Sequence, residues 1–286
     1  MKKRDVLSSP RIREIKRKKR KIFFFKLFLL LFFLLVVFTG FVFLSRWQYI
    51  NVKDVEVTGI QDSDALIVKN AVEEQIFENY LLFFPKTNRF LIPKSKIIAE
   101  LSDKYKRLKD ISIKISNNFL SVSVSAREGA YLWCGDRFSP GTDDVCYFLD
   151  NTGYIFEEAP YFSGSVYFKF FGTIDNAGNE PLGKYFQSDV FEKLISFQKT
   201  LELVGVKAES LEILIGGDMA FYLRSTQIVD LPPKIIFNAG DDFVKLSENL
   251  QTALSTEPLL SDFRNKYENL EYIDLRFGNK VYYKFR

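Results

Sequence analysis

The chain begins with one long apolar run and continues with shorter, alternating runs. The long run covers residues 22–44, IFFFKLFLLLFFLLVVFTGFVFL, and Lys26 is its one charged residue. At about 1.5 Å per residue, a helix of this length spans about 34 Å, which is enough to cross the hydrocarbon core of a bilayer. A cleaved signal peptide has an apolar core of only about 7 to 15 residues. The pattern therefore predicts a single transmembrane helix over residues 22–44.

Residues 50–128 carry the pattern of one strand, two helices and two further strands. The opening NVKDVEVTG alternates imperfectly, and a helix is then expected to begin at a cap on Asp62 or Ser63 and to continue through Phe77. A second helix is expected over residues 94–105, followed by two strictly alternating runs that predict strands. The apolar positions on which this rests are Val52, Val55 and Val57, then Leu66, Val68, Val72 and Ile76, then Ile111, Ile113 and Ile115, then Leu120, Val122 and Val124. The predicted first domain has the order β-α-α-β-β.

Residues 129–286 are expected to form a second domain that consists mostly of strands. Two helices are predicted within it, one over residues 189–203 with Ser188 as N-cap and Gly205 just past its end, and one over residues 241–254. The predicted strand runs are AYLWC, CYFLD, GYIFEEA, SVYFKFFG, LEILIG, MAFYLRS and KIIFNAG. The fold class is therefore α+β, with a membrane helix, a small mixed module and a larger β domain.

The last residues, YIDLRFGNKVYYKFR, read as a hairpin that turns at Gly278-Asn279. A two-residue loop would place apolar residues opposite charged ones. A three-residue loop over 278–280, or an equivalent bulge, gives one apolar and one polar face. We therefore expect Phe277 opposite Val281, Leu275 opposite Tyr283 and Ile273 opposite Phe285. The outer strand of such a hairpin has backbone groups without a partner, which proteins usually protect or use.

Charge is divided unevenly along the chain. Residues 1–21 hold eleven Lys and Arg against two acidic residues, a net charge of +9. The residues after position 45 hold 28 Lys and Arg against 34 Asp and Glu, a net charge of −6. The positive-inside rule keeps the basic tail in the cytoplasm, beside anionic lipid, and Trp47 and Tyr49 fall at the opposite interface. Because the basic residues form one juxtamembrane block, no nucleic-acid partner is expected.

Two cysteines, Cys134 and Cys146, flank the polar stretch GDRFSPGTDDV between two apolar runs. In an oxidising compartment they could join the base of a long hairpin, which loop-entropy estimates value at about 3 kcal/mol. The alternative is two unpaired small core residues. No metal site is implied, because two thiols cannot complete a typical zinc shell in a chain without histidine.

Two short stretches resemble catalytic motifs but lack their essential residues. GNEPLGK, residues 178–184, has the spacing of a phosphate-binding loop, but Tyr185 stands where Ser or Thr should bind magnesium. SFQK, residues 196–199, has the Ser-x-x-Lys spacing of penicillin-interacting enzymes, yet neither Ser-Asp-Asn nor Lys-Thr-Gly occurs. The absence of histidine also removes the commonest general base. We therefore expect neither an enzyme nor a cofactor.

In this order, the segments resemble the FtsQ/DivIB family of bacterial cell-division proteins, and the likeness covers almost the whole chain. Its most specific pieces are the opening INVKDVEVTGI with Val55, Val57 and Gly59, the turn LDNTGYIF over residues 149–156, and YIDLRFGNKVYYK over residues 272–284. The pair Cys134 and Cys146, with the insert between them, departs from the family pattern.

The resemblance implies a POTRA module at residues 50–128 and a non-enzymatic scaffold of the divisome at the septum, in the cell membrane. Such a scaffold binds FtsB and FtsL, helps to regulate septal peptidoglycan synthesis, and recruits other divisome components through the POTRA module. Two alternatives are a membrane-anchored cell-wall enzyme and a POTRA-type assembly factor. The latter needs a long barrel-forming region, for which fewer than 160 residues remain after residue 128.

The resemblance also implies that FtsB binds the terminal hairpin by strand addition. Lys284 and Arg286 are expected on its polar face, where they would discourage self-pairing and attract an acidic partner. The partner-binding residues that we expect are Arg276, Phe277, Gly278, Asn279, Val281, Tyr282, Tyr283, Lys284 and Phe285.

Overall fold

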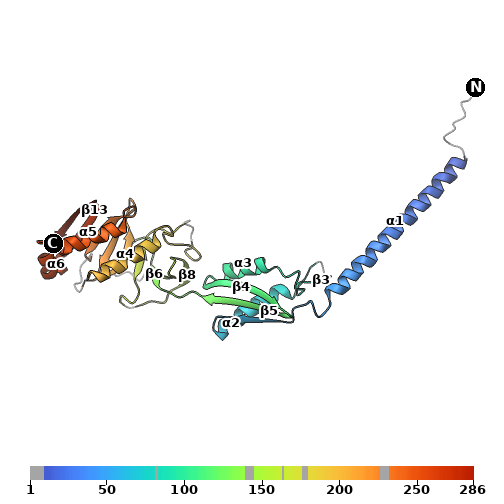
Figure 1. The fold of residues 1–286 in the computed structure, drawn as a ribbon, viewed down its shortest axis with the longest axis horizontal. Coiled ribbons are helices and arrows are strands. Elements are labelled where there is room, and N and C mark those ends of the chain that lie inside the picture. The colour runs from blue at the N-terminus through green and yellow to red at the C-terminus, as the bar shows by residue number, and fades with distance from the viewer. Residues whose placement is uncertain (1–9, 81–82, 139–144, 163, 176–179, 226–231) are drawn as a thin grey trace, which may run out of the picture. The chain divides into compact units, whose positions relative to one another are not determined.

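The computed structural model describes residues 10–80, 83–138, 145–162, 164–175, 180–225 and 232–286 (Figure 1). Its contacts group the chain into two compact units. Unit 1 comprises residues up to Leu101 together with Asp110–Val124, and unit 2 comprises Ser102–Lys109 and Ser125–Arg286. The chain is a mixed α+β protein with one long amino-terminal helix.

The amino-terminal helix α1 spans Pro10–Ser45. Its part from Glu14 to Ser45 is long and apolar enough to cross a membrane. The predicted boundary between a basic tail and an apolar span at residue 21 is a change of side-chain chemistry, because the helix continues through it. Residues 1–9 of the predicted tail lie outside the described residues.

The small module of unit 1 has the predicted order with one addition. Its elements are β1 (Asp54–Thr58), α2 (Asp62–Ile76), β2 (Asn79–Tyr80), β3 (Phe84–Pro85), α3 (Lys94–Lys104), β4 (Leu108–Ser116) and β5 (Phe119–Ala126). Its sheet has the order β1-β5-β4, with β1 parallel to β5. The addition is the short β2–β3 pair between the two helices.

Two details of the first helix were predicted wrongly. Gln61 is the N-cap of α2, and Asp62 is already its first residue. Val68, Val72 and Ile76 are buried as expected, but Leu66 is 59% exposed. At about 100° per residue, a position two residues before Val68 lies on the opposite side of the helix.

Unit 2 is built on one nine-stranded sheet. Its strands are β6 (Tyr131–Trp133), β7 (Tyr147–Leu149), β8 (Ile155–Glu158), β9 (Lys169–Phe171), β10 (Ala208–Ile213), β11 (Asp218–Leu223), β12 (Lys234–Asn238), β13 (Leu270–Phe277) and β14 (Lys280–Phe285). They lie in the order β14-β13-β12-β11-β10-β9-β6-β7-β8. Each of the predicted strand runs overlaps one of these strands, although β10 begins three residues before the run LEILIG and β11 one residue before MAFYLRS.

Three helices and one short 3-10 turn accompany this sheet: α4 (Phe191–Leu203), α5 (Phe243–Leu254), α6 (Leu259–Lys266) and η2 (Tyr267–Asn269). The prediction of two helices missed α6, which has eight residues and buries Leu259 alone, so no apolar stripe marks it. Ser188 is not the cap of α4, since Val190 holds that position. Gly205 does follow the helix with a φ of 83°, as its predicted role requires.

The main core lies between the sheet and helices α4 and α5 (Figure 1). Phe197 of α4 contacts the rings of Phe221, Phe237 and Phe243 at centroid distances of 5.5, 5.2 and 5.5 Å. These aromatic contacts join strands β11 and β12 to both helices. The sheet order that results leaves β14 and β8 as the two outer strands.

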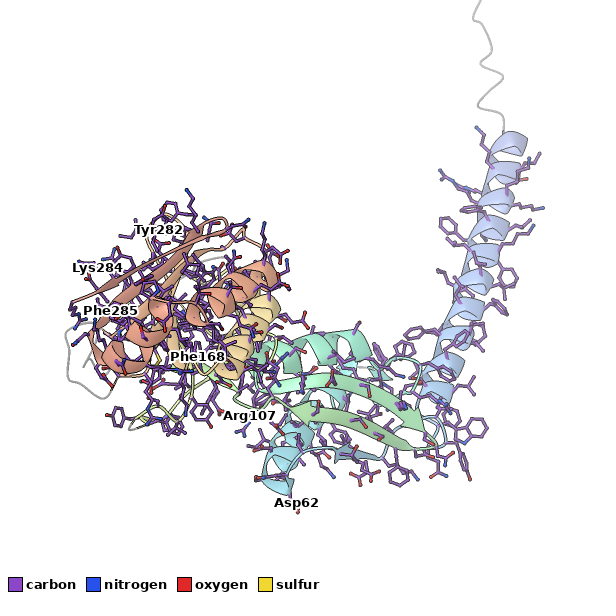
Figure 2. All side chains as sticks on the ribbon, turned by 60° about the vertical axis from the view of Figure 1, so that its left-hand side comes forward. Asp62, Arg107, Phe168, Tyr282, Lys284 and Phe285 are labelled. Atoms are coloured by element: carbon purple, nitrogen blue, oxygen red, sulfur yellow. A yellow bond between two sulfur atoms is a disulfide. The ribbon has the colours of Figure 1, made fainter. Side chains whose placement is uncertain are left out.

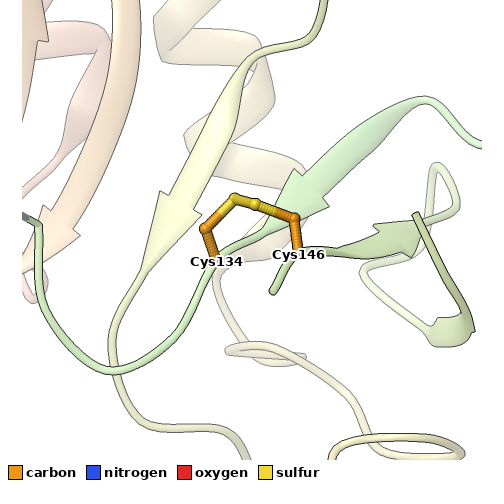
Figure 3. Close-up of a disulfide and its surroundings, with 2 residues drawn as sticks. All are labelled: Cys134 and Cys146. Carbon is orange, nitrogen blue, oxygen red and sulfur yellow. A yellow bond between two sulfur atoms is a disulfide. The ribbon is translucent and has the colours of Figure 1, made fainter. Parts of the chain in front are cut away.

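A disulfide joins Cys134, just after β6, to Cys146, just before β7 (Figure 3). The two Cα atoms lie 4.2 Å apart. The bond therefore closes the base of the β6–β7 hairpin, and residues 139–144 of its loop lie outside the described residues.

Candidate functional site

The terminal hairpin forms one border of the nine-stranded sheet. Strand β14 pairs with β13 on its inner side and has no neighbouring strand on its outer side among the described residues. Figure 2 shows Tyr282, Lys284 and Phe285 in this outer strand. An outer strand of this kind offers a row of backbone donors and acceptors to an added strand.

The predicted register of the hairpin is wrong. Phe277 pairs with Lys280 across the two-residue turn Gly278-Asn279, which is the loop length that the sequence argument rejected. Further along, Asp274 pairs with Tyr282, and Ile273 pairs with Tyr283 rather than with Phe285. Gly278 has a φ of 67°, as a tight hairpin turn requires.

A bulge in β13 allows a two-residue turn and still leaves the apolar side chains of the hairpin on one face. An equivalent bulge was the alternative to a three-residue loop in the prediction. Between the pairs Asp274–Tyr282 and Phe277–Lys280, two residues of β13 stand opposite Val281 alone. Such a bulge shifts the side-chain alternation by one residue. Ile273 and Tyr283 therefore face the same side although the loop has only two residues.

An ion-pair cluster lies at the bulge. The side chain of Arg276 donates to Asp274 at 2.9 and 2.5 Å and to Asp218 of β11 at 2.6 Å. Asp274 is buried, and its burial alone would raise its pKa, but the hydrogen bonds from Arg276 outweigh burial and lower the pKa overall. Ion pairs therefore stabilise the bulge, and one of them joins β13 to β11, the second strand further into the sheet.

The turn has a second attachment. The side-chain amide of Asn249, on α5, donates to the backbone oxygen of Gly278 at 2.9 Å. Sequence reasoning missed both Asn249 and Asp218, because each lies far from the hairpin in the chain and neither belongs to a local motif. Together these residues position the hairpin from the helix and from the sheet.

The two faces of β14 differ in exposure. Val281, Tyr283 and Phe285 are half-buried and pack against the main core. Lys280, Tyr282 and Lys284 are exposed on the opposite face. Lys284 is paired with Glu271 of β13 at 2.7 Å, so part of the positive charge expected for an acidic partner is neutralised within the chain.

Backbone direction also alternates along β14. The backbone N–H of Arg286 donates to Asn269 at 2.7 Å, so residue 286 faces inward. Because hydrogen-bonding direction alternates along an antiparallel strand, the backbone groups of Lys284, Tyr282 and Lys280 also face β13. Those of Val281, Tyr283 and Phe285 then face outward, toward an added strand.

An exposed aromatic pair lies beside these outward groups. Phe277 is 55% exposed and Tyr282 is 49% exposed, and their rings meet edge to face at 5.1 Å. The guanidinium of Arg276 lies 5.8 Å from the Phe277 ring. Large aromatic side chains next to a basic group are typical of partner-binding surfaces.

One catalytic look-alike lies within the described residues, and the other lies partly outside them. Ser196 lies in α4, where its hydroxyl donates to the backbone oxygen of Glu192 at 3.0 Å. Gly178 and Asn179, which begin the phosphate-loop look-alike, lie outside the described residues. Among the described residues, no group of three or more His, Cys, Asp or Glu side chains is arranged to hold a metal ion.

Comparison of the chain with models of protein families and with curated proteins finds no match. The terminal strand and the distribution of charge are therefore the features that bear on function.

Proposed function

We propose that this protein is a single-pass membrane scaffold that binds a partner strand along β14. In the FtsQ/DivIB interpretation, the partner is FtsB, held together with FtsL, and the protein helps to regulate septal peptidoglycan synthesis in the bacterial divisome. The observation that carries the proposal is the outer strand β14, which has outward backbone groups at three positions and an exposed aromatic pair beside it, Phe277 of β13 and Tyr282 of β14.

The membrane part of the proposal rests on α1 and on the charges that flank it. A helix of sufficient length and apolar character follows a basic segment with a net charge of +9 over residues 1–21. The positive-inside rule assigns this segment to the cytoplasm and the residues that follow the helix to the outside. A disulfide in unit 2 suits an oxidising exterior.

A proline substitution tests strand addition at one outward position. Tyr283→Pro removes an N–H that faces away from β13, and the matched variant Tyr283→Val removes the same ring but keeps the N–H. We expect Tyr283→Pro to weaken binding of the full-length protein to FtsB by at least about 100-fold, and Tyr283→Val by less than about tenfold. Binding is measured by titration in detergent micelles, with circular dichroism to check the fold. Unchanged affinity of a folded Tyr283→Pro variant would contradict strand addition.

Truncation of the chain after Asn279 would be a weaker test of strand addition than this proline substitution. It removes Val281, Tyr283 and Phe285, which pack against the main core, so loss of binding would also follow from loss of structure. A separate assay addresses the enzyme alternative: the purified protein is incubated with peptidoglycan, and turnover would refute the scaffold interpretation.

A further inference from the structure

The segment between α2 and α3, residues 77–93, has an apolar composition that its position on the surface does not explain. Its sequence is FENYLLFFPKTNRFLIP. In the described part of this inter-helix segment, Phe90 is 79% exposed and Phe83 is 48% exposed. Trp47 and Tyr49, just after α1, are exposed as well. Exposed aromatic side chains gathered in one region mark a surface that is covered by something other than water.

Hydrogen bonds hold this segment at the carboxyl-terminal end of α1. The buried side chain of Asn88 donates to the backbone oxygen and to the hydroxyl of Ser45, both at 3.3 Å. Asn51 also donates to the backbone oxygen of Ser45, at 3.0 Å. These contacts satisfy carbonyl groups that a helix end leaves without a partner. They also fix the position of the segment along the axis of α1.

Two phenylalanines of the segment reach back along α1. Phe83 and Phe84 contact Phe38 of α1, with ring centroids 5.8 and 5.9 Å apart. Phe38 precedes Leu44, the last residue of the apolar run, by six residues, or about 9 Å along the helix axis. The apolar run exceeds a hydrocarbon core of about 30 Å by only about 4 Å, so Phe38 stays about 5 Å or more inside it. At the tilt of about 20° that transmembrane helices have on average, residues in ring contact with Phe38 lie at a similar depth.

Two cationic side chains border the apolar rings of this region. The guanidinium of Arg46 is 3.5 Å from the backbone oxygen of Phe83, and that of Arg89 is 5.6 Å from the Phe90 ring. Glu78, the one carboxylate of the segment, is paired with Lys86 at 2.5 Å. Apolar rings bordered by cations are typical of surfaces that enter the lipid headgroup region.

We propose that the described part of the inter-helix segment, residues 77–80 and 83–93, inserts into the bilayer leaflet at the carboxyl-terminal end of α1. Phe83 and Phe84 then contact acyl chains, while Arg46 and Arg89 contact headgroup phosphates. This proposal rests on the membrane span of the proposed function and is independent of the partner that binds β14. Its consequence is that the small module after α1 is held against the membrane at two points, the helix and the segment, rather than by the helix alone.

Spin labels measure the depth of the segment directly. Single cysteines are introduced at Phe83, Phe90, Phe41 and Leu66 of the full chain, and each is labelled with a nitroxide under non-reducing conditions. The native cysteines do not react, because both are in the disulfide. The protein is reconstituted in vesicles of phosphatidylcholine and phosphatidylglycerol. Collision rates with oxygen, which enters lipid, and with a nickel chelate, which stays in water, are then compared.

We expect the label at Phe83 to show a high ratio of oxygen to nickel collisions, close to that at Phe41 of α1. The label at Phe90 should have an intermediate ratio, and that at Leu66, on an exposed position of α2, a low one. The Phe90 variant keeps the test valid if Phe83 is needed for folding.

Each other outcome overturns the proposal in a distinguishable way. Low ratios at Phe83 and Phe90 with a high ratio at Phe41 would show that α1 spans the membrane while the segment stays in water. Low ratios at all positions would refute the span itself. Exclusion of both reagents at Phe83 would indicate a protein contact, such as a second copy of this chain.

Discussion

At the scale of single residues, two glycines explain parts of the sequence that suggested the family. Gly59 has a φ of 98°, and a Cβ added there would lie 2.0 Å from the backbone oxygen of Val124 on β5. Gly153 has a φ of 80°, and its Cβ would lie 2.9 Å from the Phe191 ring. Both positions require a residue without a side chain, because strand or helix packs directly against the turn.

Substitution of Gly59 tests this requirement. Gly59→Ala should lower the free energy of unfolding of unit 1 by about 3 kcal/mol, since it adds a steric overlap to an unfavourable φ. Gly216→Ala is the control, because Gly216 also has a positive φ, 103°, but has open space around its Cβ position. Gly216→Ala should lower the free energy of unfolding by only about 1 kcal/mol. Denaturant unfolding measures both, and equal losses would show that the contact with Val124 does not matter.

The turn over residues 149–156 is organised by one buried carboxylate. Asp150 accepts from the backbone N–H of Thr152 at 2.8 Å, from the Thr152 hydroxyl at 2.6 Å and from the side chain of Arg127 at 2.5 Å. Burial alone would raise the pKa of Asp150, but these hydrogen bonds outweigh it and lower the pKa below 3.8. The ionised form is therefore the one that stabilises the fold.

This shift predicts an acid-dependent stability. Because the folded pKa is the lower one, the contribution of Asp150 is complete above its unfolded value of about 3.9 and is lost as pH falls through the folded pKa. Asp150→Asn should lower the free energy of unfolding by about 2 to 3 kcal/mol at pH 7, and the difference from wild type should shrink below pH 4. Asp103→Asn, at a fully exposed carboxylate, should leave the free energy of unfolding nearly unchanged. If the difference in free energy of unfolding between Asp150→Asn and wild type did not depend on pH, the stabilising role of the ionised carboxylate would be contradicted.

At the scale of elements, the terminal hairpin combines a stable inner side with an exposed outer side. The bulge at Leu275 and Arg276 turns Phe277 into solvent, beside Tyr282, while Ile273 stays buried. The hairpin can therefore present aromatic rings without exposing the core beneath it.

Alanine substitution of the aromatic pair tests whether these rings bind the partner. The double variant Phe277→Ala and Tyr282→Ala should weaken FtsB binding by at least about tenfold, because each exposed ring contributes area that only the complex buries. Leu203→Ala is the matched control, since Leu203 is exposed at the end of α4, and it should leave the affinity unchanged. Titration calorimetry compares the variants. If the double variant and Leu203→Ala changed the affinity for FtsB equally, the partner would bind a surface that does not depend on the hairpin.

At the scale of the whole molecule, charge and hydropathy divide the chain into regions with different environments. The basic block over residues 1–21 precedes the apolar helix, and the rest of the chain carries a net charge of −6. The basic block is attracted to anionic lipid, whereas a net negative charge is not.

The orientation is tested with introduced thiols. A cysteine at Ser9 should resist a membrane-impermeant thiol reagent in intact cells, because the basic block is expected inside. A cysteine at Val244, an exposed position of α5, should react under the same conditions. Labelling at residue 9 with protection at residue 244 would reverse the proposed orientation.

Much of the fold was predictable from the sequence because its signals are local. Alternation along a strand and apolar spacing along a helix are set by neighbours in the chain, so the strand runs of both domains and helices α2, α4 and α5 were located correctly. Helix α6 was not, because eight residues with one buried side chain produce no periodic signal. Cap positions were missed by one or two residues, since several polar side chains compete for each helix start.

The terminal edge shows where local reasoning ends. By itself, the sequence determined that Val281, Tyr283 and Phe285 share an apolar face and that a turn lies at Gly278-Asn279. Only the tertiary structure decided the register, because the bulge depends on Asp218, 58 positions away from Arg276 in the chain. It also decided that β14 is an outer strand, since strand order in a sheet follows from the packing of all strands against the helices. A pattern of alternation specifies which side a residue faces, but not which strand lies beside it.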